Sequence, residues 1–112
     1  MLHITKFFAN WCQPCKAMNP IIEELKQENE DIVFNSVDIE NNPQLRAEHF
    51  IRQIPTFIVF KNGIEMARKS GSMTKSAFQE WINELRNLQP EILPNESAGI
   101  PGAGNIVLRS TS

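Results

Sequence analysis

With 112 residues, of which 41% are hydrophobic and 21% charged, the chain has the length and composition of one globular domain. A formal net charge of −2, without a dense Lys/Arg cluster, argues against nucleic acid or an anionic membrane as a partner. No apolar run approaches the roughly 18 residues of a membrane helix, and no signal-peptide pattern opens the chain. We therefore expect a cytoplasmic protein.

The first half of the chain predicts a strand, a helix and a second strand. The strand over 2–9 is rich in β-formers, and the second strand covers 32–39. Between them, apolar residues repeat with the period of a helix that runs from Cys12 to Glu28 and is kinked at Pro20. These apolar residues are Met18, Ile21, Ile22 and Leu25.

The second half predicts a short helix over 43–50, a buried strand over 57–60, an Asn62-Gly63 hairpin and a return strand from Ile64 to Ser70. A last helix follows, capped by Thr74. Its apolar stripe consists of Phe78, Trp81, Ile82, Leu85 and Leu88. The resulting order, β-α-β-α-β-β-α, predicts an α/β domain with a mixed central sheet flanked by helices.

We place this domain at residues 1–88 and a Pro/Gly-rich C-terminal tail at residues 89–112. The tail is expected to be flexible. Alternatively, its β-branched segment Ile106-Val107-Leu108 adds a strand to the edge of the sheet.

The two cysteines, Cys12 and Cys15, are spaced C-x-x-C where the first strand leads into the first helix. On a first helical turn, this spacing brings both sulfurs to one face, within reach of a disulfide. The helix N-terminus favours a thiolate at Cys12, and Pro14 suits the first turn because it lacks an N–H. A zinc site needs four ligands, and only His3 and His49, both expected at the surface, remain. The motif therefore predicts a redox dithiol without a metal.

Several spaced motifs resemble the thioredoxin family. The segment 8–16 resembles its active-site signature, and segment 51–56 resembles its cis-proline loop. Phe60-Lys61-Asn62-Gly63, Gly71 and Pro20 match its hairpin, its substrate-facing glycine and its helix-kinking proline. The resemblance covers residues 2–88. It begins at the strand over 2–9, so we expect a short form without the β-α unit that precedes this strand in many members.

The resemblance implies a protein disulfide reductase whose only redox group is the disulfide itself. Cys12 would attack a substrate disulfide, and Cys15 would then release the reduced substrate. The implied docking surface consists of Trp11, Pro14, Ile54, Pro55 and Gly71. The implied partners are disulfide-containing proteins and, as electron donor, a thioredoxin reductase.

Two residues depart from the family pattern and are expected to tune the dithiol together with Pro14. Gln13 stands where the family has glycine, and Lys6 where it has a buried aspartate. By strand alternation, Lys6 lies beneath the active-site helix, where an ammonium close to Cys15 would stabilise the thiolate. The alternative is that Lys6 reaches the sheet edge or pairs with Asp38.

Two other functional classes remain open from the sequence. One is a glutaredoxin-like reductase that uses glutathione, although no basic glutathione site is evident. The other is a non-catalytic binding module of the same fold, or a dimer that holds a metal or iron–sulfur cluster through Cys12. We expect a monomer, with a dimer as the alternative.

Overall fold

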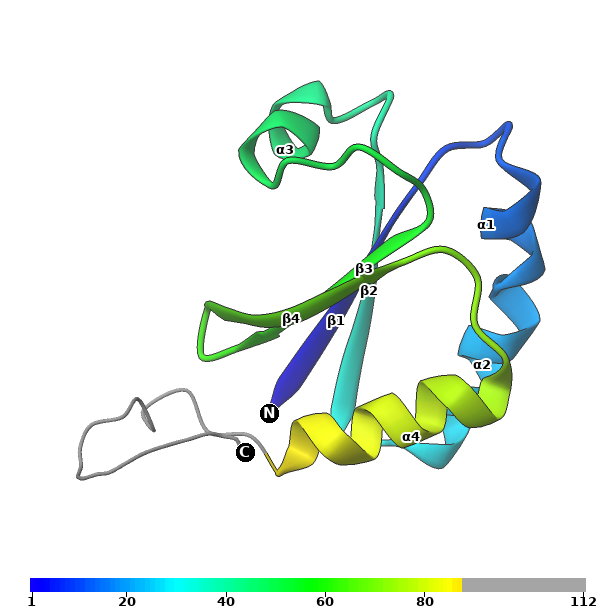
Figure 1. Cartoon of the computed structure of the whole chain (residues 1–112), viewed down its shortest axis with the longest axis vertical. Coiled ribbons are helices and arrows are strands. Elements are labelled where there is room, and N and C mark those ends of the chain that lie inside the picture. Colours follow the sequence, from blue (N-terminus) through cyan, green and yellow to red (C-terminus); the bar gives the residue numbers. More distant parts are fainter. Residues whose placement is uncertain (88–112) are drawn as a thin grey trace.

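The computed structural model describes residues 1–87, in which eight elements follow one another along the chain (Figure 1). They are β1 (Leu2–Phe8), α1 (Gln13–Ala17), α2 (Asn19–Glu28), β2 (Ile32–Asp38), α3 (Pro43–Glu48), β3 (Thr56–Lys61), β4 (Ile64–Ser70) and α4 (Lys75–Arg86). The expected α/β order is confirmed, with the first helix divided in two. Leu88 and the tail over 89–112, with its predicted strand, lie outside the described residues.

The four strands form one mixed sheet in the order β2-β1-β3-β4. β1 pairs in parallel with β2 and antiparallel with β3, and β3 pairs antiparallel with β4. Helices α2 and α4 lie on one side of the sheet, and α3 lies on the other (Figure 1). Because β1 and β2 are parallel, the loops that follow them, leading to α1 and α3, leave the sheet at the same end.

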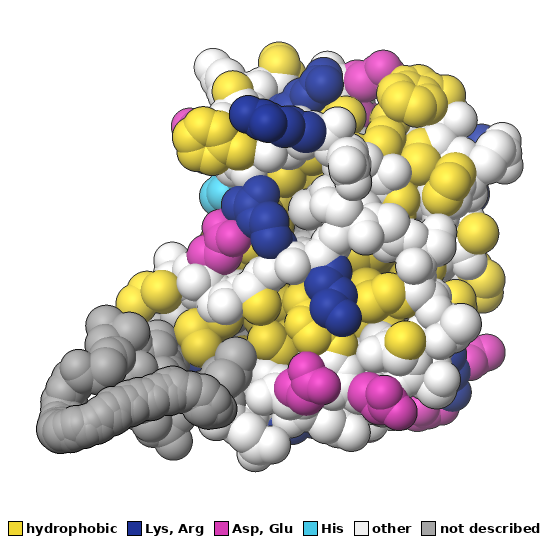
Figure 2. All heavy atoms as spheres, viewed as in Figure 1, with side chains coloured by type: hydrophobic (Ala, Val, Ile, Leu, Met, Phe, Trp, Pro, Cys, Tyr) yellow, Lys and Arg dark blue, Asp and Glu magenta, His cyan; other side chains and the backbone are white. Residues whose placement is uncertain are grey.

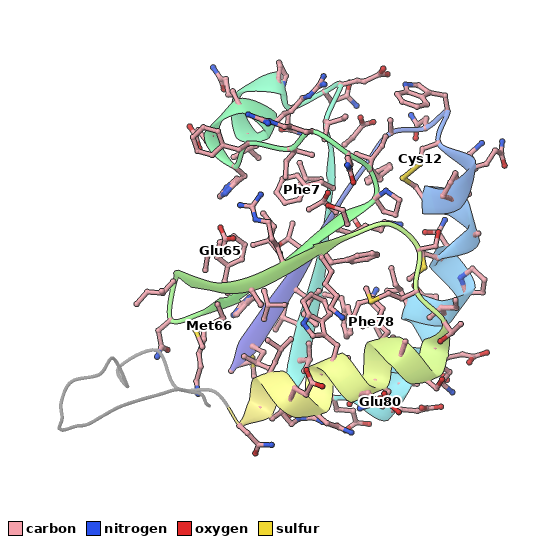
Figure 3. The ribbon with its side chains drawn as sticks, in the orientation of Figure 1. Phe7, Cys12, Glu65, Met66, Phe78 and Glu80 are labelled. Atoms are coloured by element: carbon pink, nitrogen blue, oxygen red, sulfur yellow. A yellow bond between two sulfur atoms is a disulfide. The ribbon has the colours of Figure 1, made fainter. Side chains whose placement is uncertain are left out.

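Two apolar clusters fill the space between the sheet and its helices. The larger cluster joins one sheet face to α2 and α4, and the smaller one lies near α1 and α3. In β3, the side chains of Phe57, Ile58 and Val59 are all fully buried because both faces of this strand are covered. Figure 3 shows Phe78 between the sheet and α4, where its ring meets that of Phe57 edge to face at 5.0 Å.

The predicted helix over 12–28 is wrong in one respect, because it is two helices separated at Met18. Pro20 has no N–H to donate to Lys16, and its ring would crowd that carbonyl, so the helical ladder stops. The Met18 N–H instead bonds the Cys15 carbonyl at 3.2 Å, and the Met18 carbonyl accepts the N–H of Ile22 at 2.9 Å. Pro20 therefore interrupts the helical hydrogen bonds where a kink was expected, while Met18 itself keeps a right-handed helical conformation.

Helix α3 ends at Glu48, two residues before the predicted end, in a hydrogen-bonded C-terminal turn. The N–H of Ile51 bonds the carbonyl of Arg46 at 3.0 Å, and the N–H of Phe50 bonds that of Ala47 at 3.2 Å. This pair of bonds is the Schellman motif, which requires a left-handed residue and usually has glycine there. Phe50 occupies that position with φ 54°, at a cost of about 1 kcal/mol for its β-carbon.

The β3–β4 hairpin is formed as predicted. Asn62 and Gly63 have φ values of 55° and 78°, the left-handed pair that a two-residue turn requires. The return strand, β4, is an edge strand that carries Glu65, Arg68 and Lys69. Within residues 1–87, no helix is long and apolar enough to span a membrane.

Candidate functional site

The two cysteines form a disulfide where β1 leads into α1. Their Cα atoms are 5.3 Å apart, and Cys12 is the N-cap of α1 (Figure 3). The Cys12 sulfur accepts the backbone N–H of Cys15 at 3.1 Å, and the Cys12 N–H donates to the Ala9 carbonyl at the same distance. Pro14 lies in the first turn, where its missing N–H leaves no bond unmade.

The electrostatic surroundings of Cys12 favour a negative sulfur after reduction. In the first turn of α1, the N–H of Cys15 already points to the Cys12 sulfur, and no side chain of this turn is acidic. Lys16 stands in the last turn of the same short helix. A thiolate at Cys12 would therefore have a hydrogen-bond donor in place and no carboxylate from its own helix turn to repel it.

Trp11 lies at the surface directly before the disulfide, and its side chain is 63% exposed. Its indole N–H donates to the carboxylate of Glu40 at 2.6 Å. Glu40 follows β2 and is separated from Trp11 by 29 positions, so no local pattern pointed to it. This bond fixes the orientation of an exposed ring that would otherwise rotate freely.

The segment that leads into β3 lies beside the disulfide. The Ile54–Pro55 peptide bond is cis, as the family resemblance implied. Ile54 packs in the same apolar cluster as Cys12 and Cys15. The N–H of Gly71 donates to the Pro55 carbonyl at 2.8 Å, which brings the loop after β4 to this segment.

Lys6 is buried, as strand alternation predicted, with 7% of its surface exposed. Its ammonium donates to the side chain of Asn19 at the start of α2 and lies 5.1 Å from the centre of the Phe8 ring. The expected alternative of a pair with Asp38 is wrong, because the ammonium contacts Asn19 and Phe8 and forms no ion pair with Asp38. Burial lowers the pKa of Lys6 from its ordinary value.

The other residues singled out by the sequence have different surroundings. Gln13 and Pro14 are exposed, and so is His3. The prediction that His49 is a surface residue is wrong, since its ring is half-buried between Phe7 and Phe60, at centroid distances of 5.6 and 5.7 Å. A helix pattern shows which face points inward, but it does not show that α3 lies against aromatic residues of the sheet.

A disulfide between two cysteines three positions apart, at the start of a helix that packs on a mixed α/β sheet, defines a dithiol–disulfide redox protein. The comparisons with known proteins make this more specific. A sequence model of the family described as Thioredoxin matches residues 1–84.

A thioredoxin of Rickettsia typhi is 40% identical over 82 residues, covering 72% of this chain and 78% of that protein. The crystal structure of Fasciola hepatica thioredoxin superposes with a TM-score of 0.70 at 34% identity, over 74% of this chain and 79% of the other. A chain from a study of thiol resolution in yeast mitochondrial 1-Cys peroxiredoxin has a TM-score of 0.69 at 28% identity. The match covers 74% of this chain and 77% of the other.

The chain belongs to the thioredoxin family. It is a thiol–disulfide oxidoreductase of the thioredoxin type, a disulfide reductase with its redox disulfide at Cys12 and Cys15.

Proposed function

We propose that Cys12 is the attacking residue and Cys15 the resolving residue of this reductase. The observation that supports this order is the position of Cys12 as the N-cap, where its sulfur already accepts the N–H of Cys15 at 3.1 Å. The same contact would hold a Cys12 thiolate once the disulfide is reduced.

The exchange then runs in two steps. The Cys12 thiolate attacks one sulfur of a substrate disulfide, so that a mixed disulfide forms and the other substrate sulfur leaves as a thiolate. Cys15 loses its proton and attacks the Cys12 sulfur, which releases the second substrate thiolate and restores the Cys12–Cys15 disulfide. Two electrons pass from the protein to the substrate, and a reductase must return them.

The substrate would dock on exposed and half-buried groups around the disulfide. Among residues 1–87, the backbone N–H and carbonyl of Ile54 make no hydrogen bond, so they are free to pair with an extended peptide. Trp11 and Pro14 supply exposed apolar surface, and Pro55 and Gly71 supply the adjoining backbone.

Gln13, Pro14 and Lys6 are the proposed tuning residues. Gln13 is exposed between the cysteines and would contact the substrate instead of the core. Lys6 places a buried positive charge beneath α2, where it favours the reduced, negatively charged state. Its contact with Asn19 sets the position of that charge relative to the break between α1 and α2.

The proposed partners are disulfide-containing proteins and a thioredoxin reductase as electron donor, in a cytoplasm that keeps the dithiol reduced. Support comes from the thioredoxin relatives and from the structural neighbour studied with a peroxiredoxin. A peroxiredoxin is accordingly a suitable substrate with which to begin.

Dithiothreitol-driven reduction of insulin, followed by turbidity, tests the proposed roles. Wild type should accelerate the reaction, and Cys12→Ser should not. Pre-reduced Cys15→Ser, freed of dithiothreitol and then mixed with insulin, should stop at a mixed disulfide visible on a non-reducing gel. Full activity of Cys12→Ser would refute the assignment. Activity only with glutathione and glutathione reductase would favour the glutaredoxin-like alternative instead.

A further inference from the structure

One exposed aromatic residue has no role in the site described above. Phe50 is 74% exposed, which makes it the most exposed large hydrophobic residue of the described part of the chain. Trp11, in comparison, is 63% exposed and held by Glu40. The Phe50 ring makes no aromatic contact within residues 1–87, whereas the ring of His49, the preceding residue, packs against Phe7 and Phe60 of the sheet.

The backbone at Phe50 gives this exposure its significance. Phe50 occupies the left-handed position of the turn that ends α3, with φ 54°, where glycine is the usual residue. A side chain here adds steric strain, and the exposed phenyl group buries little surface that could offset it. Backbone strain of this kind is concentrated at functional positions of proteins.

Two arginines accompany Phe50. Arg46 and Arg52 are both exposed and form no ion pair or side-chain hydrogen bond within residues 1–87. In contrast, Arg68 pairs with Glu65 at 2.8 Å, and Arg86 pairs with Asp31 at 2.8 Å. We call Phe50, Arg46 and Arg52 the Phe50 patch.

The three residues of the Phe50 patch are held near one another by the backbone. The N–H of Ile51, which lies between Phe50 and Arg52, donates to the carbonyl of Arg46 at 3.0 Å. Figure 2 shows Lys/Arg side chains beside an exposed hydrophobic ring at the end of the molecule that α3 occupies. An aromatic side chain flanked by arginines is the composition enriched in protein interfaces.

The Phe50 patch lies at the same end of the sheet as the disulfide. Leu45 and Ile51, its neighbours in the chain, pack in the apolar cluster that contains Cys12 and Cys15. Phe50 is four residues from Ile54, so their Cα atoms are at most about 14 Å apart. A protein bound at the disulfide can therefore extend to Phe50.

We propose that the Phe50 patch docks an acidic segment of the protein whose disulfide is reduced, with an apolar side chain against Phe50 and carboxylates against Arg46 and Arg52. This inference rests on the proposed function, because it places the substrate disulfide at Cys12. It adds a selectivity for substrates with acidic residues flanking an apolar one.

Charge supports a protein partner in preference to a single-stranded nucleic acid. The Phe50 patch supplies two cations, Arg46 and Arg52. Two arginines suffice to pair with two carboxylates, whereas a nucleic-acid groove follows many phosphates with a larger set of cations.

Two synthetic peptides test the proposal on the full chain. They share one intramolecular disulfide and differ in an extension, Glu-Leu-Glu or Gln-Leu-Gln. We expect stopped-flow reduction of the acidic peptide by the reduced protein to be about tenfold faster at low salt, with the difference lost at high salt. Arg52→Gln should reduce this preference at least threefold, whereas Phe50→Gly removes the contact with the leucine that both peptides share and should slow the reduction of both at least threefold.

Matched variants separate docking from folding. Asn62→Gly replaces another left-handed residue, and Lys26→Gln removes a distant charge, so both should keep the full preference. Phe50→Gly should also leave the melting temperature unchanged or raise it. A large fall in that temperature would make Phe50 a structural residue and overturn the proposal.

Binding without chemistry distinguishes failure of this inference from failure of the proposed function. The same peptides with serine in place of cysteine, labelled for fluorescence anisotropy, should bind with an affinity that Arg52→Gln weakens. Equal binding of the acidic and neutral peptides would overturn the docking proposal, whatever the reductase activity. Tighter binding of a labelled single-stranded RNA, weakened by Arg52→Gln, would overturn it in favour of a nucleic-acid surface.

Discussion

Asn29 is a buried polar residue that joins α2 to α4, and we predict that Asn29→Ala strongly destabilises the fold. Only 3% of its surface is exposed. Its amide nitrogen donates to the Leu25 carbonyl at 2.9 Å and to the Gln79 side chain at 2.8 Å. Its amide oxygen accepts from Gln79 at 3.2 Å and from Arg86 at 2.8 Å.

The loss of stability in Asn29→Ala depends on whether each former partner of Asn29 can form a hydrogen bond with water instead. A neutral hydrogen bond contributes about 1 kcal/mol, and one to a charged group contributes roughly 1.5–3 kcal/mol. Gln79 and Arg86 are at least partly accessible to water, so their groups can form hydrogen bonds with water after Asn29 is removed. The hydrogen bond to the Leu25 carbonyl is buried, and water does not replace it as easily. We therefore expect a loss of about 2–3 kcal/mol, which lowers the melting temperature of a domain of this size by roughly 10–20 °C.

Urea unfolding followed by circular dichroism measures this loss. Asn35→Ala, at an exposed position of β2 with no side-chain hydrogen bond in residues 1–87, is the matched control and should change stability by less than about 0.5 kcal/mol. An Asn29→Ala loss below about 1 kcal/mol with an unchanged denaturant slope would refute the reasoning. It would show that water replaces the network at little cost.

Three further predictions concern the potential, the acid range and a helix cap. Lys6→Met should make the redox potential of the dithiol more negative by about 10–30 mV, because it removes a buried cation that favours the reduced state. The control Lys26→Met should leave the potential unchanged. An unchanged potential in Lys6→Met would contradict the proposed role of Lys6. The hydrogen bond from Arg86 lowers the pKa of Asp31 below its ordinary value of 3.8. The contribution of that pair is therefore complete above pH 3.8 and is lost as the pH falls through the lowered pKa. Asp31→Asn should accordingly lose less stability than wild type between pH 4 and pH 2, and parallel acid unfolding curves would disprove the assignment. Thr74→Ala removes the side chain that caps α4 at 3.1 Å and should cost about 1 kcal/mol in thermal unfolding, an effect that Ser76→Ala should not reproduce.

Features with a local physical cause were predictable from the chain itself. The Asn62-Gly63 turn, the Thr74 cap and the apolar stripe of α4 depend on backbone conformation and residue period, and the structure confirms them. Cys12 at the start of a helix is equally local, since spacing and an adjacent strand suffice to indicate it.

Other features depend on contacts between distant segments. The partners of Lys6, Trp11 and Asn29 are 13, 29 and 50 positions away, at Asn19, Glu40 and Gln79, and no periodicity indicates them. The half-burial of His49 also follows from how α3 packs on the sheet.

The sequence by itself therefore determined the order of elements, the redox dithiol and the family to which the chain belongs, because these depend on local conformation and short spacings. The tertiary structure alone decided where the buried charge of Lys6 is held and that Phe50 is exposed at a strained position. The physical reason is that hydrogen-bond partners and solvent exposure are set by which surfaces meet across the sheet.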